Sequence, residues 1–184
     1  MPTRDEALAL WKEFNSDPSL LNHALAVEAV LRFLARKAGE DETVWGIVGL
    51  IHDLDYEKHP DRHCAMTREI LEQRGWPPEM VRAAVSHGWG ICSDAEPLSP
   101  LEKTLYAVDE LTGLVTACAL VRPSKSVRDL EPKSVLKKWK QKGFAAGVNR
   151  EVIEKGAQRL GVDLESLIAD TIQAMRAVAA EIGL

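Results

Sequence analysis

The sequence lacks any apolar segment long enough to cross a membrane. Its longest apolar runs, Val44 to Ile51 and Leu114 to Val121, fall far short of the roughly 20 residues that a membrane helix needs. The first residues mix acidic and basic side chains, and they contain neither the apolar stretch nor the small-residue cleavage site of a secretory signal. We therefore expect a cytoplasmic protein with no membrane partner.

Cysteine is also scarce, with three residues in the whole chain: Cys64, Cys92 and Cys118. The number is odd and no CxxC pair occurs, so the sequence suggests neither a disulfide framework nor a thiolate zinc site. We expect free structural thiols. A P-loop, a nucleophile elbow and a Rossmann glycine pattern are absent too, so none of these motifs competes for the chemistry.

The composition fits one soluble globular domain of ordinary size. The chain has 184 residues, of which 46% are hydrophobic and 28% charged. Its net charge is −5, yet the segment from Arg122 to Lys142 carries eight Lys and Arg residues against Asp129 and Glu131. Such a basic strip either binds phosphate or forms a solvated face. We do not expect nucleic acid as the partner.

Apolar residues recur at the helical period along nearly the whole chain, and no strand pattern of convincing length occurs. Three sites combine good signals for a helix start: Thr3 with Glu6, Asp17 before Pro18, and the Ser99-Pro100 pair. We expect an all-α protein of about eight or nine helices. They include helices at about 18–38, 41–54, 60–74, 77–86, 99–121, 133–141, 150–160 and 163–182.

Four polar residues interrupt apolar helix faces. His52 and Asp53 end a strongly apolar helix, His23 shares a stripe with leucine and valine, and Asp109 lies among apolar residues of a long helix. Burial of a charge is costly unless the charge is paired or bound to a metal. Taken alone, His23 is more often a hydrogen-bonded core histidine. Four such residues on separate apolar faces indicate a shared partner.

Divalent cations accept imidazole nitrogen and carboxylate oxygen together, so these four residues suit a metal site. His63 and His87 also fall on inward stripes and could complete a second site, with Asp53 bridging two ions about 3.5–4 Å apart. We place His59 in the loop before Pro60, outside the site.

Asp55 and Tyr56 lie beside the predicted ligands. They could orient those ligands, contact a substrate or simply close the helix end.

The order His23, then His52-Asp53, then Asp109 in a helical chain resembles the HD superfamily of metal-dependent phosphohydrolases. Val108-Asp109-Glu110-Leu111 looks like the last ligand motif of that family. More closely, nearly the whole chain is similar to small bacterial HDIG-domain hydrolases. The resemblance implies an HD-type helical bundle in one domain, residues 1–184, with a core at about 18–121 and a helical extension at 122–184.

Details of the resemblance bear on the metal number and the substrate. His63 and His87 resemble the two additional histidines of dinuclear members. This chain has Asp55 and Tyr56 where some relatives have Gly and Lys, so no role of that lysine carries over. The GYP triplet of cyclic-di-GMP phosphodiesterases is absent.

The resemblance implies a hydrolase that uses one or two divalent ions, whether Fe, Mn, Ni, Zn, Co or Mg. A bound ion lowers the pKa of water toward about 7 and so provides hydroxide, which Asp53 would orient. We expect Arg122 and Lys125 to neutralise charge on the phosphoryl oxygens. The expected substrate is a small phosphate ester such as a nucleotide. Two alternatives stay open: a di-iron oxygenase of the same fold, and a non-catalytic metal-binding signalling module.

Overall fold

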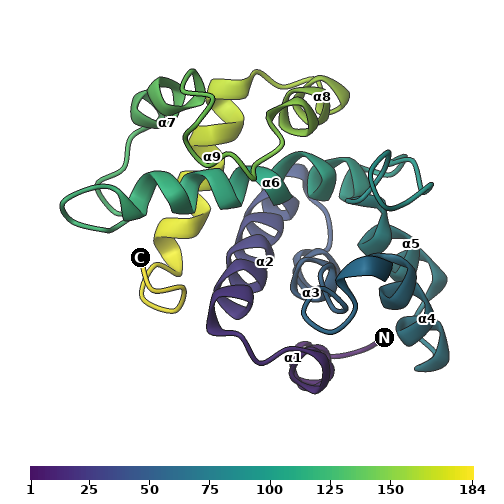
Figure 1. The fold of residues 1–184 in the computed structure, drawn as a ribbon. Coiled ribbons are helices and arrows are strands. Elements are labelled where there is room, and N and C mark those ends of the chain that lie inside the picture. The colour runs from purple at the N-terminus through teal and green to yellow at the C-terminus, as the bar shows by residue number, and fades with distance from the viewer.

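The protein is built from helices, and a computed structural model describes all residues, 1–184 (Figure 1). The only β-type pairing is an isolated bridge between Trp89 and Ser93. This confirms the predicted all-α class. The nine α-helices and the one 3-10 helix (η1) are α1 (Arg4–Phe14), α2 (Pro18–Ala38), α3 (Glu42–Ile51), η1 (Pro60–Arg62), α4 (Ala65–Gln73), α5 (Pro78–Ser86), α6 (Pro100–Leu120), α7 (Pro132–Trp139), α8 (Arg150–Leu160) and α9 (Leu164–Ala177).

The predicted helix starts are confirmed. Thr3 and Ser99 each form a capping box with the glutamate three residues later, at the starts of α1 and α6. Asp17 accepts the backbone N–H of Ser19 at the start of α2. These caps satisfy backbone donors that the first helical turn leaves without partners, and so they fix where each helix begins.

Two helix boundaries differ most from the prediction, and the helix expected at about 41–54 also ends three residues early, at Ile51. The helix expected at 60–74 is divided into η1 and α4, because Cys64 adopts φ +66° and breaks the helical path between them. The last helix ends at Ala177 rather than near Ile182, because Val178 leaves helical geometry and turns follow. Apolar periodicity continues through both places, so it gave no signal of either break.

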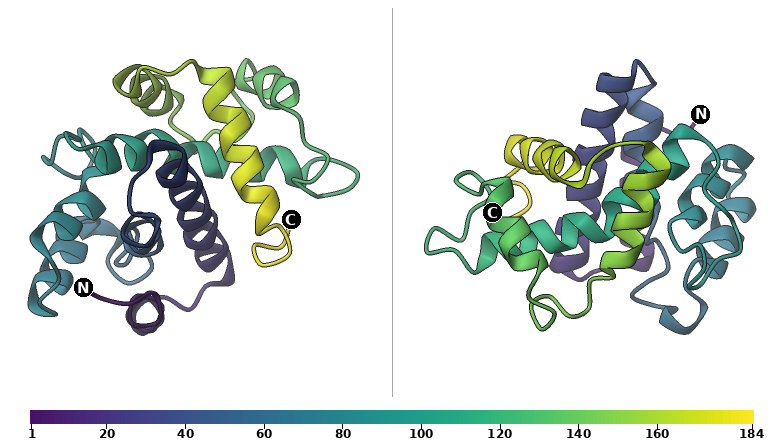
Figure 2. Two further views of the ribbon diagram at one scale, coloured as in Figure 1. Left: turned by 180° about the vertical axis from the view of Figure 1, so that it is seen from behind. Right: turned by 90° about the horizontal axis from the view of Figure 1, so that it is seen from above.

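Helix α6 crosses the middle of the molecule (Figure 1). Helices α7 and α8 cover one side of it, and α2 and α5 pack against it from the other side. Helix α3 packs on α2 and α5. Helix α9 runs across both α2 and α6, as the view from behind shows (Figure 2). One hydrophobic cluster of 41 buried residues extends from Ala7 to Ile182, so the C-terminal helices share the core with the rest. None of the helices combines the length and apolar character that crossing a bilayer requires.

A close approach between α2 and α3 positions two of the predicted ligands. A Cβ atom at Gly49 would lie 3.0 Å from the backbone nitrogen of Glu28, which is tighter than ordinary van der Waals contact. Glycine at this position therefore lets the two helices pack closely. His23 lies on α2 and His52 caps the end of α3, so this contact brings their side chains together.

Helix α6 offers a matched test of the core. Leu114 is fully buried, whereas Leu120, on the same helix, is 48% exposed. We expect Leu114→Ala to lower the free energy of unfolding by about 2–5 kcal/mol, because it leaves a cavity in the core. Leu120→Ala should change it by no more than about 0.5 kcal/mol. Urea denaturation followed by circular dichroism measures both values, and equal effects would contradict this packing.

Candidate metal centre

The structure brings all six predicted metal ligands to one place. They come from five separate parts of the chain, which meet where α2, α3, α5 and α6 pack together. Their positions are His23 on α2, His52 and Asp53 directly after α3, His63 just before α4, His87 at the end of α5, and Asp109 in the middle of α6.

One group of side chains consists of His23, His52 and Asp109, whose ligand atoms all lie within 4.8 Å of one another. Oδ1 of Asp109 lies 3.0 Å from Nε2 of His23 and 3.3 Å from Nε2 of His52. The carboxylate of Asp53 faces the same group, with Oδ2 3.3 Å from Nε2 of His52. Two imidazoles and two carboxylates therefore point at a common centre.

The second group consists of Asp53, His63 and His87. The Nε2 atoms of the two histidines are 3.0 Å apart. Oδ1 of Asp53 lies 3.4 Å from Nε2 of His63 and 3.3 Å from Nε2 of His87. Asp53 thus turns one carboxylate oxygen toward each group, so it is the one side chain that faces both.

The backbone fixes which nitrogen of two histidines faces the centre. Nδ1 of His52 lies 2.7 Å from the carbonyl oxygen of Gly49, and Nδ1 of His87 lies 2.6 Å from that of Ala84. A carbonyl oxygen only accepts hydrogen bonds, so Nδ1 must carry the proton in both rings. In a neutral ring the inward Nε2 then has a free lone pair, as a metal ligand requires.

The carboxylate of Asp55 fixes which nitrogen of His63 faces the centre. It is fully buried, its Oδ1 accepts from Nδ1 of His63 at 2.7 Å, and its Oδ2 accepts from the backbone N–H of Thr67 at 2.8 Å. A carboxylate behind a histidine fixes the orientation of the ring and raises its basicity. Of the three roles considered for Asp55 from sequence, this contact favours that of orienting a predicted ligand.

The electrostatics of the cluster call for positive charge at its centre. Burial by itself would lower the pKa of His52, but Asp53 and Asp109 outweigh it and raise that pKa well above its usual value. Burial would likewise raise the pKa of Asp53 and Asp109, yet the neighbouring histidines outweigh it and lower both pKa values: His52 first, with His87 beside Asp53 and His23 beside Asp109. Nε2 of His52 is buried without any hydrogen-bond partner. A divalent cation would satisfy this nitrogen and both carboxylates, so the residues present fit a metal ion.

The cluster opens into a cavity of about 410 Å³. Tyr56, which is half-exposed and packs edge-on against His63, stands at its wall, as do Glu110 and Cys92. Burial raises the pKa of the Glu110 carboxyl. None of the 14 residues that line the cavity is a lysine or an arginine.

The expectation for Arg122 and Lys125 was wrong in its geometry. Arg122 pairs with Asp129 at 2.8 Å, Lys125 is exposed, and neither lines the cavity. Arg122 follows Asp109 by thirteen residues, and a helix of that length spans roughly 20 Å. Helix α6 therefore carries this segment away from the cluster, to the far end of the molecule (Figure 1). His59 lies in the loop before η1 and outside the cluster, as predicted.

Comparison with protein families agrees with this geometry. The HD domain matches residues 20–114, more than half of the chain, and this range contains all six clustered side chains. Proteins of this family are generally metal-dependent hydrolases. No solved structure matches the chain. Assignment to the HDIG subgroup stays a prediction.

The raised pKa of His52 predicts how the stability of the metal-free protein depends on pH. A folded-state pKa above the unfolded value of about 6.5 gives stability that is complete below that pH and is lost as the pH rises through the folded-state pKa. We expect the melting temperature of chelator-treated protein to fall as the pH is raised above about 6.5. His52→Gln should flatten this dependence, whereas the loop variant His59→Gln should retain it. A dependence unchanged in His52→Gln would contradict the interpretation.

Proposed function

The chain belongs to the HD domain family, and from this premise we propose that it is a metal-dependent phosphohydrolase acting on a nucleotide or another small phosphate ester. The observation that carries the proposal is the position of Asp53, whose two carboxylate oxygens face two separate groups of histidines. Such a carboxylate suits a pair of ions that together clamp a phosphoryl oxygen. The donor set of imidazole and carboxylate fits Fe, Mn, Ni, Zn or Co, and the chain itself does not choose among them.

The chain offers two metal positions. His23, His52 and Asp109 would hold one ion, His63 and His87 the other, and Asp53 would contact both. Bound there, divalent ions supply Lewis acidity toward a phosphoryl oxygen and lower the pKa of water toward about 7.

The protein's own groups would position the substrate and shield the reaction. Because no lysine or arginine lines the cavity, the negative charge of a phosphate would be offset at the cluster itself. The cavity of about 410 Å³ has the size of a small-molecule site, which supports a small substrate rather than a macromolecule. Tyr56 and Glu110 stand where such a substrate would lie.

Asp53→Ala tests the assignment most directly, because it removes a ligand from both positions. We expect the variant to lose bound metal and to release phosphate about 10³-fold more slowly, since metal ions contribute several kcal/mol to phosphoryl transfer. Metal content is measured on the purified protein, and phosphate release is screened on nucleotides, sugar phosphates and dinucleoside polyphosphates.

His59→Ala, which removes a histidine outside the cluster, is the matched control and should behave like the unaltered protein. Equal activity in Asp53→Ala and the unaltered protein would refute the proposed hydrolase. Turnover that needs ferrous iron and dioxygen would instead support the oxygenase alternative. Bound metal without turnover of any of these compounds would support the signalling module.

The role of Asp55 generates a separate prediction. Asp55→Asn keeps the size of the side chain but removes the charge that supports His63, and changes of this kind lower metal affinity about 10–100-fold. We expect the second ion to be lost on dialysis while the first is retained, as measured by metal analysis per chain. Asp61→Asn, at an exposed aspartate of η1, is the control. Retention of both ions in Asp55→Asn would argue against this support.

A further inference from the structure

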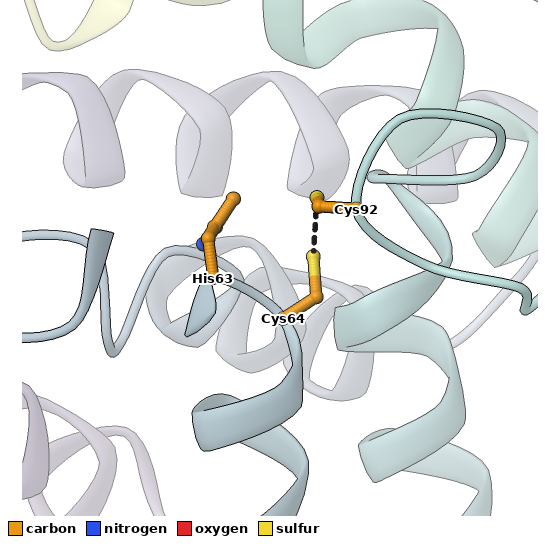
Figure 3. A group of neighbouring side chains, drawn as sticks. All are labelled: His63, Cys64 and Cys92. Atoms are coloured by element: carbon orange, nitrogen blue, oxygen red, sulfur yellow. Dashed lines mark hydrogen bonds between the residues drawn. The ribbon is translucent and has the colours of Figure 1, made fainter. Parts of the chain in front are cut away.

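Two thiols that are far apart in the sequence meet beside the cluster. Sγ of Cys64, at the start of α4, lies 3.2 Å from Sγ of Cys92, in the loop after α5. Figure 3 shows the two sulfur atoms facing each other with His63 next to them. All three thiols are free, as expected. The proximity of Cys64 and Cys92 was not predicted, because they are 28 residues apart in the sequence and no local motif links them.

The loop that carries Cys92 is held in place by its own backbone. The N–H groups of Cys92 and Ser93 both donate to the carbonyl oxygen of Gly88. A Cβ atom at Gly88 would lie 2.4 Å from Sγ of Cys92 and 2.6 Å from Sγ of Cys64. Any larger residue at position 88 would thus displace the sulfur atoms, so glycine leaves the space in which they lie next to each other.

The two thiols differ in their access to solvent. Cys92 is exposed and lines the cavity mouth, whereas Cys64 is 2% exposed. A small oxidant therefore reaches Cys92 first, and Cys64 is already in place behind it. Cys118 is buried within α6 and has no thiol partner.

We propose that Cys64 and Cys92 are a reversible oxidation site, which forms an intramolecular disulfide when the protein meets a peroxide. The Cys92 sulfur attacks one peroxide oxygen, the O–O bond breaks, and a sulfenic acid and one water result. The Cys64 sulfur then attacks that of Cys92, the S–S bond forms, and the S–O bond breaks. The departing hydroxide takes the Cys64 proton and leaves as a second water. Two thiols are oxidised, one hydrogen peroxide is reduced, and a dithiol reductant reverses the change.

The required movement is small. A disulfide has an S–S distance of about 2.05 Å, so the sulfur atoms must approach by about 1.2 Å. The Cys92 side chain is exposed on a loop and can supply this shift. In a reducing compartment, a disulfide formed in this way is transient and serves redox sensing rather than folding.

The bond would act on the second metal position. His63 directly precedes Cys64, and His87 directly precedes Gly88, whose carbonyl holds the Cys92 loop. Metal ligands must keep their distances within about 0.2 Å, so a shift of the cross-linked segments disturbs both histidines. We expect the oxidised protein to hold the second ion more weakly. This consequence rests on the proposed function, whereas disulfide formation does not.

The test treats the full-length, chelator-treated protein with hydrogen peroxide. We expect a loss in intact mass equal to two hydrogen atoms, a peptide that joins Cys64 to Cys92 without reduction, and recovery of the original mass with dithiothreitol. Cys118→Ala should behave identically, and Cys92→Ser should keep its mass. Cross-links only between molecules, a bond to Cys118, or oxidation of Cys92 to the sulfinic acid without any disulfide would overturn the proposal.

A second measurement follows the consequence for metal. The unaltered protein and Cys92→Ser are loaded with Mn²⁺, treated with peroxide and dialysed, and their metal is counted. We expect oxidation to remove one ion from the unaltered protein and none from Cys92→Ser. If the disulfide forms and both ions stay, the link to the metal position is refuted. If no metal binds even before oxidation, the proposed function fails while the disulfide result stands.

Discussion

The arrangement of this site depends on one partly buried carboxylate, that of Asp53, which faces four imidazoles with its two oxygens. Each oxygen lies within 3.4 Å of at least one histidine nitrogen on its own side. A carboxylate in this position is costly to bury unless positive charge stands on both sides of it. The histidines on the two sides come from different helices, and each side contacts the carboxylate of Asp53. This one side chain therefore links separate helices of the bundle.

The helical scaffold places two of the four histidines at the ends of helices. His52 and His87 each occupy the last turn of a short helix, where an Nδ1 atom reaches a carbonyl oxygen three residues back. Helix termini leave such carbonyl groups without helical partners, so the same contact caps the helix and orients the ring. His23 and Asp109 lie within long helices, which the close approach at Gly49 and the contact of α2 with α6 bring into range.

The sequence predicted the helices and the six clustered side chains because both leave local signals. A polar residue on an apolar stripe is visible from periodicity alone, and His23 and Asp109 were found in this way. The residues that sequence reasoning missed or misplaced depend on distance in space. Cys92 meets Cys64 only because a loop folds back onto Gly88. Arg122 seemed close to Asp109 because it follows the same helix, yet that helix carries it away.

The net charge of the cluster depends on whether one or two ions are bound, and this charge decides whether a phosphate substrate is attracted. Three aspartates, Asp53, Asp55 and Asp109, place carboxylates in or directly behind the cluster, and no lysine or arginine lines the cavity. With neutral imidazoles, one divalent ion would leave this centre negative, and a negative centre repels phosphate. A second ion would make it positive. In the proposed hydrolase, attraction of the substrate therefore depends on the position held by His63 and His87, and whatever loosens that position affects binding before it affects the reaction itself.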